Sequence, residues 1–239
     1  MDTFDFYTSI LIPQLNQGLL VSIQIIVPAA LFGVILGILV GAGRAVGKKW
    51  LIWVLNFYVS IFRGTPLVVQ LLMWFFGLPT ISLFLEAHFG PQISPISNLF
   101  RLSPYTASVL AFAMCSGAYQ SEYIRGAILS IKKGQFLGAL SLGFTKSQTF
   151  WHITCPIAIR RAIPGCGNEI IYLIKYSSLS MIVTMNDLTG QTKGIATLTF
   201  RHLECYLLVA LYYLALVTLA TWLLSYLEKR LAIPGVTKS

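Results

Sequence analysis

The apolar run "GNEIIYLIKYSSLSMIV" holds a carboxylate and an ammonium among aromatic and hydroxyl side chains. Glu169, Tyr172 and Tyr176 are three and seven residues apart, so a helix places them on one face and directs Lys175 away from it. A carboxylate beside two aromatic rings can hold a cation through charge pairing and cation–π attraction. The alternative is an ion pair of Glu169 with Lys175 or Arg63 that only ties helices together.

A second candidate is "FRGTPLVVQ", residues 62–70, where a basic side chain precedes a predicted helix break. Pro66 disfavours the helical conformation at Thr65 and lacks an N–H group, so nearby carbonyls lose a partner. Arg63 can hydrogen-bond such carbonyls or a substrate carboxylate, and broken helices in transporters often line substrate paths. The alternative is an arginine that snorkels beside a packing kink.

The basic stretch "KKGQFLGALSLGFTKSQ", residues 132–148, predicts a helix, a tight turn and a second helix. Apolar residues at offsets zero, one, four and eight form one helical stripe, namely Phe136, Leu137, Leu140 and Phe144. We expect Gly143 to end the first helix, and Thr145 with Gln148 to form a capping box that starts the next. This periodicity fits an interfacial helix on lipid headgroups as well as a docking helix for a soluble partner.

Catalytic and metal-binding patterns do not emerge from the sequence. The four cysteines show no CxxC spacing and the three histidines lie far apart, so we expect no metal site. The stretch "AGRAVGKK" resembles a phosphate loop, but Ala42 replaces its first glycine and no Ser or Thr follows Lys48. Lys175 and Ser178 could form the Ser-Lys pair of an intramembrane hydrolase, yet neither GxSxG nor HExxH occurs. We therefore expect that this chain is not an enzyme and binds no ATP itself.

The elements that must position these residues are membrane helices. Of 239 residues, 56% are hydrophobic and 10% are charged, and the mean hydropathy is +0.75; soluble domains carry about a quarter charged residues. Runs of roughly 20 apolar residues can cross the hydrocarbon core, and we predict such spans at about 17–43, 50–80, 103–121, 162–184 and 205–227. The run 50–80 would be about 45 Å long as one helix, so we expect a break at Gly64 and Pro66.

The basic residues set the orientation. Alternate threading from an outside N-terminus puts twelve of the 17 basic residues on one side, namely Arg44, Lys48, Lys49, Arg125, Lys132, Lys133, Lys146, Arg160, Arg161, Lys229, Arg230 and Lys238. The other side receives Arg101, Lys193 and Arg201 with Asp2, Asp5, Glu86, Asp187 and Glu204. The positive-inside rule therefore predicts the N-terminus outside and the C-terminus inside. No basic residue precedes Arg44, so we expect the first span to be retained and not cleaved as a signal peptide.

Residues 116–179, "SGAYQSEYIRGAILSIKKGQFLGALSLGFTKSQTFWHITCPIAIRRAIPGCGNEIIYLIKYSSL", resemble the signature region of ABC-importer permeases for polar amino acids. The stretch "FRGTPLVVQ" resembles that family's other hallmark. The similarity runs from about residue 15 to 232 and is strongest to histidine and arginine permease subunits. It implies one all-α polytopic bundle over residues 1–239, multi-pass in the bacterial cytoplasmic (inner) membrane.

The resemblance implies that the stretch 132–148, between the third and fourth spans, holds the coupling helix, which sits in a cleft of a cytoplasmic ATPase. Leu137, Gly138 and Ala139 occupy the positions of the family's E-A-A pattern, Gly143 is its glycine, and Cys155-Pro156 replaces its L-P. An apolar anchor can replace the missing glutamate, because helix-in-groove recognition rests on apolar side chains. The residues assigned to coupling are Gly134, Phe136, Leu137, Gly138, Ala139, Leu140 and Gly143.

The resemblance also bears on the cargo. The Asn168-Glu169 pair is similar to that of histidine and arginine permeases, which favours a basic amino acid; glutamine or another polar amino acid is the alternative. Where relatives commonly have D-T-S after the lysine, this chain has Tyr176-Ser177-Ser178. The candidate substrate-binding residues are Glu169, Tyr176, Ser177, Tyr172, Thr65 and Arg63.

The partners implied by the resemblance are a cytoplasmic ABC ATPase dimer that binds ATP and Mg, a second permease subunit and an extracytoplasmic amino-acid-binding protein. The second permease subunit is either identical or homologous. No cofactor is expected in this chain. Nucleic acid is disfavoured, because the basic residues form short clusters between apolar runs. An ion-driven secondary transporter is a competing class, although no second half resembling the first is visible.

Overall fold

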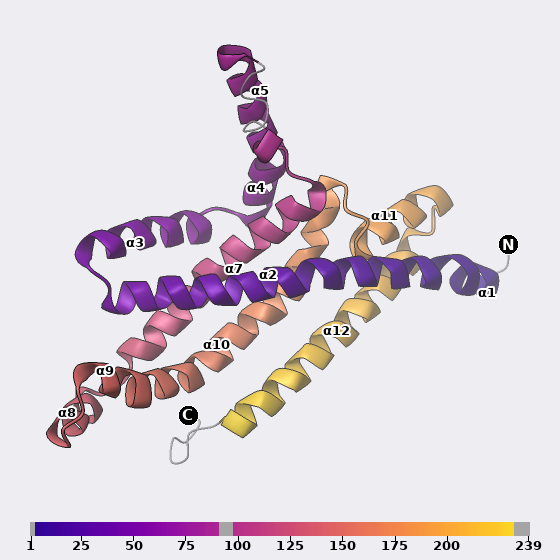
Figure 1. Ribbon diagram of the computed structural model, residues 1–239. Coiled ribbons are helices and arrows are strands. Elements are labelled where there is room, and N and C mark those ends of the chain that lie inside the picture. Colours follow the sequence, from indigo (N-terminus) through magenta and orange to yellow (C-terminus); the bar gives the residue numbers. More distant parts are fainter. Residues whose placement is uncertain (1–2, 91–97, 232–239) are drawn as a thin grey trace.

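The computed structural model describes residues 3–90 and 98–231, and every regular element in these residues is a helix (Figure 1). Asp2 and Lys238, which entered the orientation argument, lie outside the described residues. The first helix is continuous through α1 (Thr3–Asp5), η1 (Phe6–Leu11) and α2 (Ile12–Val46). The all-helical expectation is confirmed for the described part of the chain.

The packing centre is the contact of α2 with α7 (Pro104–Leu129). A stripe of glycines on α2 lets the two backbones approach closely. A Cβ atom at Gly37 would lie 2.7 Å from Cβ of Gln120, and one at Gly41 would lie 2.8 Å from the Ser121 carbonyl oxygen. Larger side chains at these positions would push the helices apart, as in other small-residue contacts of membrane helices.

The predicted span 50–80 is divided into separate helices, with the break where Gly64 and Pro66 predict it. Helix α3 (Lys49–Gly64) packs beside α2. Helix α4 (Leu67–Leu72) and η2 (Met73–Gly77) pack against α7, with Leu71 buried in the core, whereas α5 (Leu78–Phe89) projects away from the bundle (Figure 1). A short turn η4 (Asn98–Phe100) precedes α7.

Gln70 holds this break. Pro66 has no N–H to donate to the Phe62 carbonyl four residues earlier. The Gln70 Nε2 group donates to that carbonyl at 2.9 Å instead, and also to the carbonyl and hydroxyl oxygens of Thr65 at 3.0 Å. The chain therefore stays extended at Thr65 and Pro66 without leaving these acceptors unpaired.

The stretch 132–148 folds as its sequence predicts. Helix α8 (Lys133–Ser141) ends where Gly143 takes a φ of 87°. The Gly143 and Phe144 N–H groups donate to the carbonyls of Leu140 and Ala139, which is a Schellman motif. Thr145 and Gln148 then form the predicted capping box at the start of α9 (Lys146–Thr149). Both local predictions are confirmed.

The chain continues through η5 (Phe150–Thr154) and α10 (Cys155–Tyr176), so the fourth helix begins earlier than residue 162. After η6 (Ser177–Val183), a short helix α11 (Leu188–Thr199) and a long helix α12 (His202–Leu231) follow. Asp187, which was assigned above to the outer side of the membrane, is fully buried. Its carboxylate caps α11 by accepting the N–H groups of Thr189 and Gly190.

Within residues 3–90 and 98–231, three helical stretches are long and apolar enough to cross a membrane, namely Phe6–Val46, Leu67–Phe89 and His202–Leu231. Helices α7 and α10 are long but more polar, and several buried polar side chains lie on them, among them Gln120 and Glu169. Figure 1 shows α8, α9 and the C-terminal end of α12 at one end of the bundle, with α11 and the N-terminal end of α1 toward the other.

Candidate functional site

Glu169 lies on the face of α10 that packs against α7. Its side chain is only 3% exposed, and its carboxylate lies near the Ser116 hydroxyl of α7. The recess at the carboxylate leaves no room for a water molecule in this conformation, and it is lined by Leu67, Phe112, Cys115, Ser116, Glu169, Leu173 and Tyr176. The site is therefore closed here, and a ligand would have to separate α7 from α10.

Tyr172 and Tyr176 follow Glu169 on α10 as expected. Their rings stack with centroids 6.1 Å apart, and both side chains are partly exposed. The expectation that Lys175 points away from this face is wrong, because its Nζ atom lies 5.3 Å from the centre of the Tyr172 ring. The long lysine side chain folds back over the ring, which helical spacing alone does not reveal.

Arg63, at the end of α3, is brought near this face without pairing to Glu169. It attracts the Glu169 carboxylate electrostatically, but its ion pair is with Glu122 of α7, at 3.1 Å. Within the described residues, no ion pair joins Glu169 to Arg63 or Lys175. The ion pair that the alternative role of Glu169 requires, with Lys175 or Arg63, is therefore not formed in this conformation.

Two tyrosines of α7 complete the surroundings and were missed in the sequence. The Arg63 guanidinium lies 5.1 Å above the Tyr119 ring. Tyr123 lies near Glu169, Arg63 and Tyr172, and a Cβ atom at Gly165 would be 2.6 Å from its ring. We call Tyr119, Tyr123, Tyr172 and Tyr176 the tyrosine cluster. Its α7 members are four residues apart, a spacing that could have pointed to a second aromatic face.

The two hydroxyl candidates have different surroundings. Thr65 is exposed at the helix break, where its hydroxyl donates to the Ile61 carbonyl at 2.8 Å. Ser177 is fully buried, and its hydroxyl donates to the Ile174 carbonyl at 2.7 Å. The structure thus brings Arg63, Glu169, Tyr172 and Tyr176 together and leaves Ser177 inside the packing.

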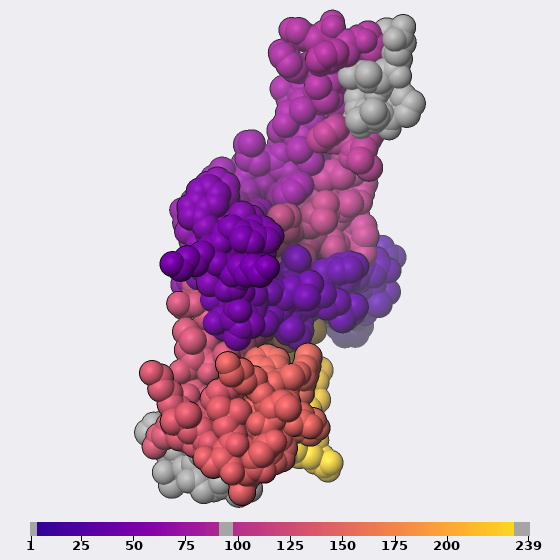
Figure 2. Space-filling model, turned by 60° about the vertical axis from the view of Figure 1, so that its left-hand side comes forward, coloured from indigo at the N-terminus to yellow at the C-terminus, as the bar shows by residue number. Residues whose placement is uncertain are grey.

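Helix α8 presents part of its predicted stripe to solvent. Leu137 is 60% exposed, Phe136 and Leu140 are half-buried, and Ala139 is buried. A groove of about 360 Å³ adjoins the helix, lined by Ile128, Ile131, Lys133, Phe136, Leu137 and Thr154. Gly134, Gly138 and Gly143 border open space. Figure 2 shows this part of the chain, in coral, at the lower end of the molecule.

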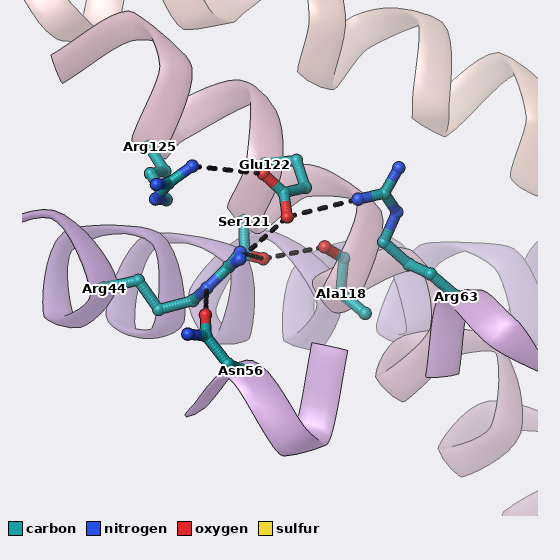
Figure 3. A network of polar contacts seen from close by, with 7 residues as sticks. All are labelled: Arg44, Asn56, Arg63, Ala118, Ser121, Glu122 and Arg125. Atoms are coloured by element: carbon teal, nitrogen blue, oxygen red, sulfur yellow. Dashed lines mark hydrogen bonds and ion pairs between the residues drawn. The ribbon is translucent and has the colours of Figure 1, made fainter. Parts of the chain in front are cut away.

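A polar network joins α2, α3 and α7 around the Arg63 side chain (Figure 3). The Glu122 carboxylate accepts from Arg44 of α2 at 2.8 Å and from Arg63 of α3 at 3.1 Å, and it faces Arg125 of α7 at 3.8 Å. Glu122 follows directly after the predicted third span. Its contacts with Arg44 and Arg63 join separate helices, so no sequence pattern could have predicted them.

Comparisons with known proteins fit this arrangement. Residues 3–233 match the family described as "Binding-protein-dependent transport system inner membrane component". The glutamine transport system permease protein GlnP of Escherichia coli (strain K12) is 34% identical over 226 residues, covering 93% of this chain and 94% of that protein. The arginine transport system permease protein ArtQ of Bacillus subtilis (strain 168) is 32% identical over 220 residues, covering 92% and 93%. The crystal structure of an amino acid ABC transporter with histidines superposes with a TM-score of 0.81 at 30% identity, covering 96% of this chain and 99% of that chain.

Proposed function

Since the chain belongs to the binding-protein-dependent transport system inner membrane component family and is a permease subunit of an amino acid ABC importer, we propose that its cargo is a basic amino acid. The observation that carries this proposal is the Glu169 carboxylate, buried between helices beside the tyrosine cluster. A buried carboxylate is costly unless a cation or hydrogen-bond donors satisfy it. A cationic side chain supplies that charge, and aromatic rings favour it further.

Arg63 supplies the complementary group for the other end of such a cargo. Its guanidinium is 41% exposed and lies near Glu169. An arginine can bind a carboxylate through two parallel hydrogen bonds, so it fits the α-carboxylate that every amino acid carries. Glutamine is the second candidate, because the relative GlnP is a glutamine permease protein and Glu169 could also accept hydrogen bonds from a side-chain amide.

The closed recess requires a conformational cycle. ATP and Mg bound by a partner ATPase dimer would drive the separation and closure of α7 and α10, with α8 as the contact that transmits the motion. A second permease subunit and an extracytoplasmic binding protein complete the assembly. The exposed apolar side chain of Leu137 and the groove beside it support the assignment of α8 as the coupling helix.

The proposed topology has five spans in the bacterial cytoplasmic membrane: α2, the broken segment from α3 to α5, α7, α10 and α12. With the N-terminus outside and the C-terminus inside, α8 faces the cytoplasm. In a variant without the four native cysteines, we expect a cysteine at Lys193 or His202 to react with a membrane-impermeant maleimide on intact cells. A cysteine at Lys133 or Lys146 should react only after the cells are opened. The reverse pattern would contradict the orientation.

Substrate-dependent ATP hydrolysis tests the function. The complex of permease, ATPase and binding protein is reconstituted in vesicles and assayed with arginine, histidine, lysine and glutamine. We expect the basic amino acids to stimulate hydrolysis. Stimulation by glutamine alone would refute a basic cargo and support glutamine as the cargo. Stimulation by none of the four amino acids would refute both proposals.

A further inference from the structure

We propose that Glu122 is a positioning residue for the cargo site: it holds the Arg63 guanidinium in place to bind the carboxylate of the transported amino acid. This inference rests on the proposed function, in which Arg63 receives that carboxylate. Glu122 itself would not touch the cargo. Its partners place it between a buried arginine on one side and a partly exposed arginine on the other.

The buried side of the network fixes Glu122. The Arg44 side chain is only 8% exposed, and its Nη2 atom lies 2.8 Å from Glu122 Oε1. Arg44 also donates through Nε to the Asn56 side chain at 2.8 Å and through Nη1 to the Ser121 hydroxyl at 3.4 Å. The Ser121 hydroxyl in turn donates to the Ala118 carbonyl. These contacts join α2, α3 and α7, so the carboxylate has little freedom to move (Figure 3).

The exposed side of the network presents Arg63. The same oxygen, Glu122 Oε1, accepts from Arg63 Nη1 at 3.1 Å, while Figure 3 shows the other amino group of Arg63 pointing away from Glu122. A guanidinium carries five N–H donors, so one ion pair leaves donors for a second carboxylate. The Tyr119 ring supports the guanidinium from one face at 5.1 Å.

Arg63 needs such support because of its place in the chain. It is the next-to-last residue of α3, and the backbone is extended at Thr65 and Pro66 before α4 begins. A long arginine side chain at a helix end has many rotamers, and fixing it in advance lowers the entropy cost of binding. The ion pair to Glu122 selects the rotamers in which Arg63 lies over Tyr119.

The charge balance of the network favours an incoming anion. Three guanidinium groups share the Glu122 carboxylate, which leaves two positive charges in excess within the network, and one when the nearby Glu169 carboxylate is counted. An α-carboxylate that reaches Arg63 would offset part of this excess. If the network only held the helices together, equal numbers of positive and negative charges would be expected, because unpaired charges are costly at low dielectric.

The experiment is a double-mutant cycle on the assembled complex. Binding of labelled arginine and of agmatine, which lacks the carboxylate, is measured without the binding protein for wild type, Glu122→Gln, Arg63→Gln and the double variant. We expect Glu122→Gln to weaken arginine binding about tenfold, as for a lost charge-assisted contact, and to leave agmatine binding unchanged. In the Arg63→Gln background, Glu122→Gln should weaken arginine binding further by less than about twofold.

The control is Glu86→Gln. Glu86 has similar exposure and pairs with Arg101 at 2.9 Å outside the network, so its substitution should change neither ligand's binding. Equal losses of arginine and agmatine binding, or an undiminished loss of arginine binding in the Arg63→Gln background, would show that Glu122 only holds helices together. If Glu122→Gln fails to assemble, Glu122→Asp keeps the charge and is assayed in the same cycle. Absence of arginine binding to the wild-type complex would refute the basic cargo instead.

Discussion

Replacing Leu137 by aspartate is expected to abolish substrate-stimulated ATP hydrolysis while the permease remains in the membrane. Leu137 is 60% exposed on α8, at the rim of the groove that also contains Phe136. An apolar side chain seated in a partner's groove stabilises the contact through buried area, by about 1.5–3 kcal/mol for a leucine. A carboxylate in the same place would also have to lose its hydration. The ATPase should therefore co-purify in smaller amount.

The matched control is Gln135→Asp. Gln135 is an exposed polar residue of the same helix, so this change introduces the same charge without removing an apolar anchor. We expect it to retain most of the stimulated hydrolysis. The measurement is ATPase activity with and without substrate, together with the amount of ATPase bound per permease. Unchanged coupling in Leu137→Asp would mean that α8 is an interfacial helix lying on lipid and not the docking contact.

Replacing Glu169 by glutamine is expected to reduce uptake of a basic amino acid by about ten- to a hundredfold while complex assembly is preserved. Glutamine keeps the size of the side chain and its hydrogen-bonding oxygen toward Ser116 but removes the charge. Hydrogen bonds to charged groups contribute about 1.5–3 kcal/mol, which corresponds to that range of affinity. Loss of a buried charge without loss of an ion pair should not destabilise the helices.

Uptake of arginine, histidine and glutamine by Glu169→Gln, compared with the amount of assembled complex, decides the role of this residue. The control is Glu204→Gln, a carboxylate that pairs with Arg201 at 3.5 Å at the start of α12. A selective loss of arginine and histidine uptake supports the cargo site. Equal losses for all three amino acids, in proportion to assembly, would make Glu169 a packing residue.

The break at Pro66 and the turn at Gly143 could be predicted because both depend on residues a few positions apart. A missing N–H group, a glycine with positive φ and a Thr-Gln capping box act through short-range contacts that the order of residues specifies. The structure confirms each of them. The face shared by Glu169, Tyr172 and Tyr176 follows from helical periodicity in the same way.

The environment of Asp187 could not be predicted in this manner. The sequence assigned it only to the outer side of the membrane; in the structure it is fully buried, and the neighbouring Leu188 N–H donates to Ser22 from the other end of the chain. Lys175 is a second example, since its contact with the Tyr172 ring depends on rotamers and not on spacing.

The sequence by itself determined that this is a helical membrane chain, where several of its helices begin and end, and that Glu169, Tyr172 and Tyr176 lie at helical spacing on α10. Composition and local chemistry are sufficient for these properties. Only the tertiary structure decided that Arg63 pairs with Glu122 and not with Glu169, and that α7 adds two tyrosines to the site. These contacts join residues far apart in the chain, so they arise from the close approach of α2, α3, α7 and α10, which no single segment encodes.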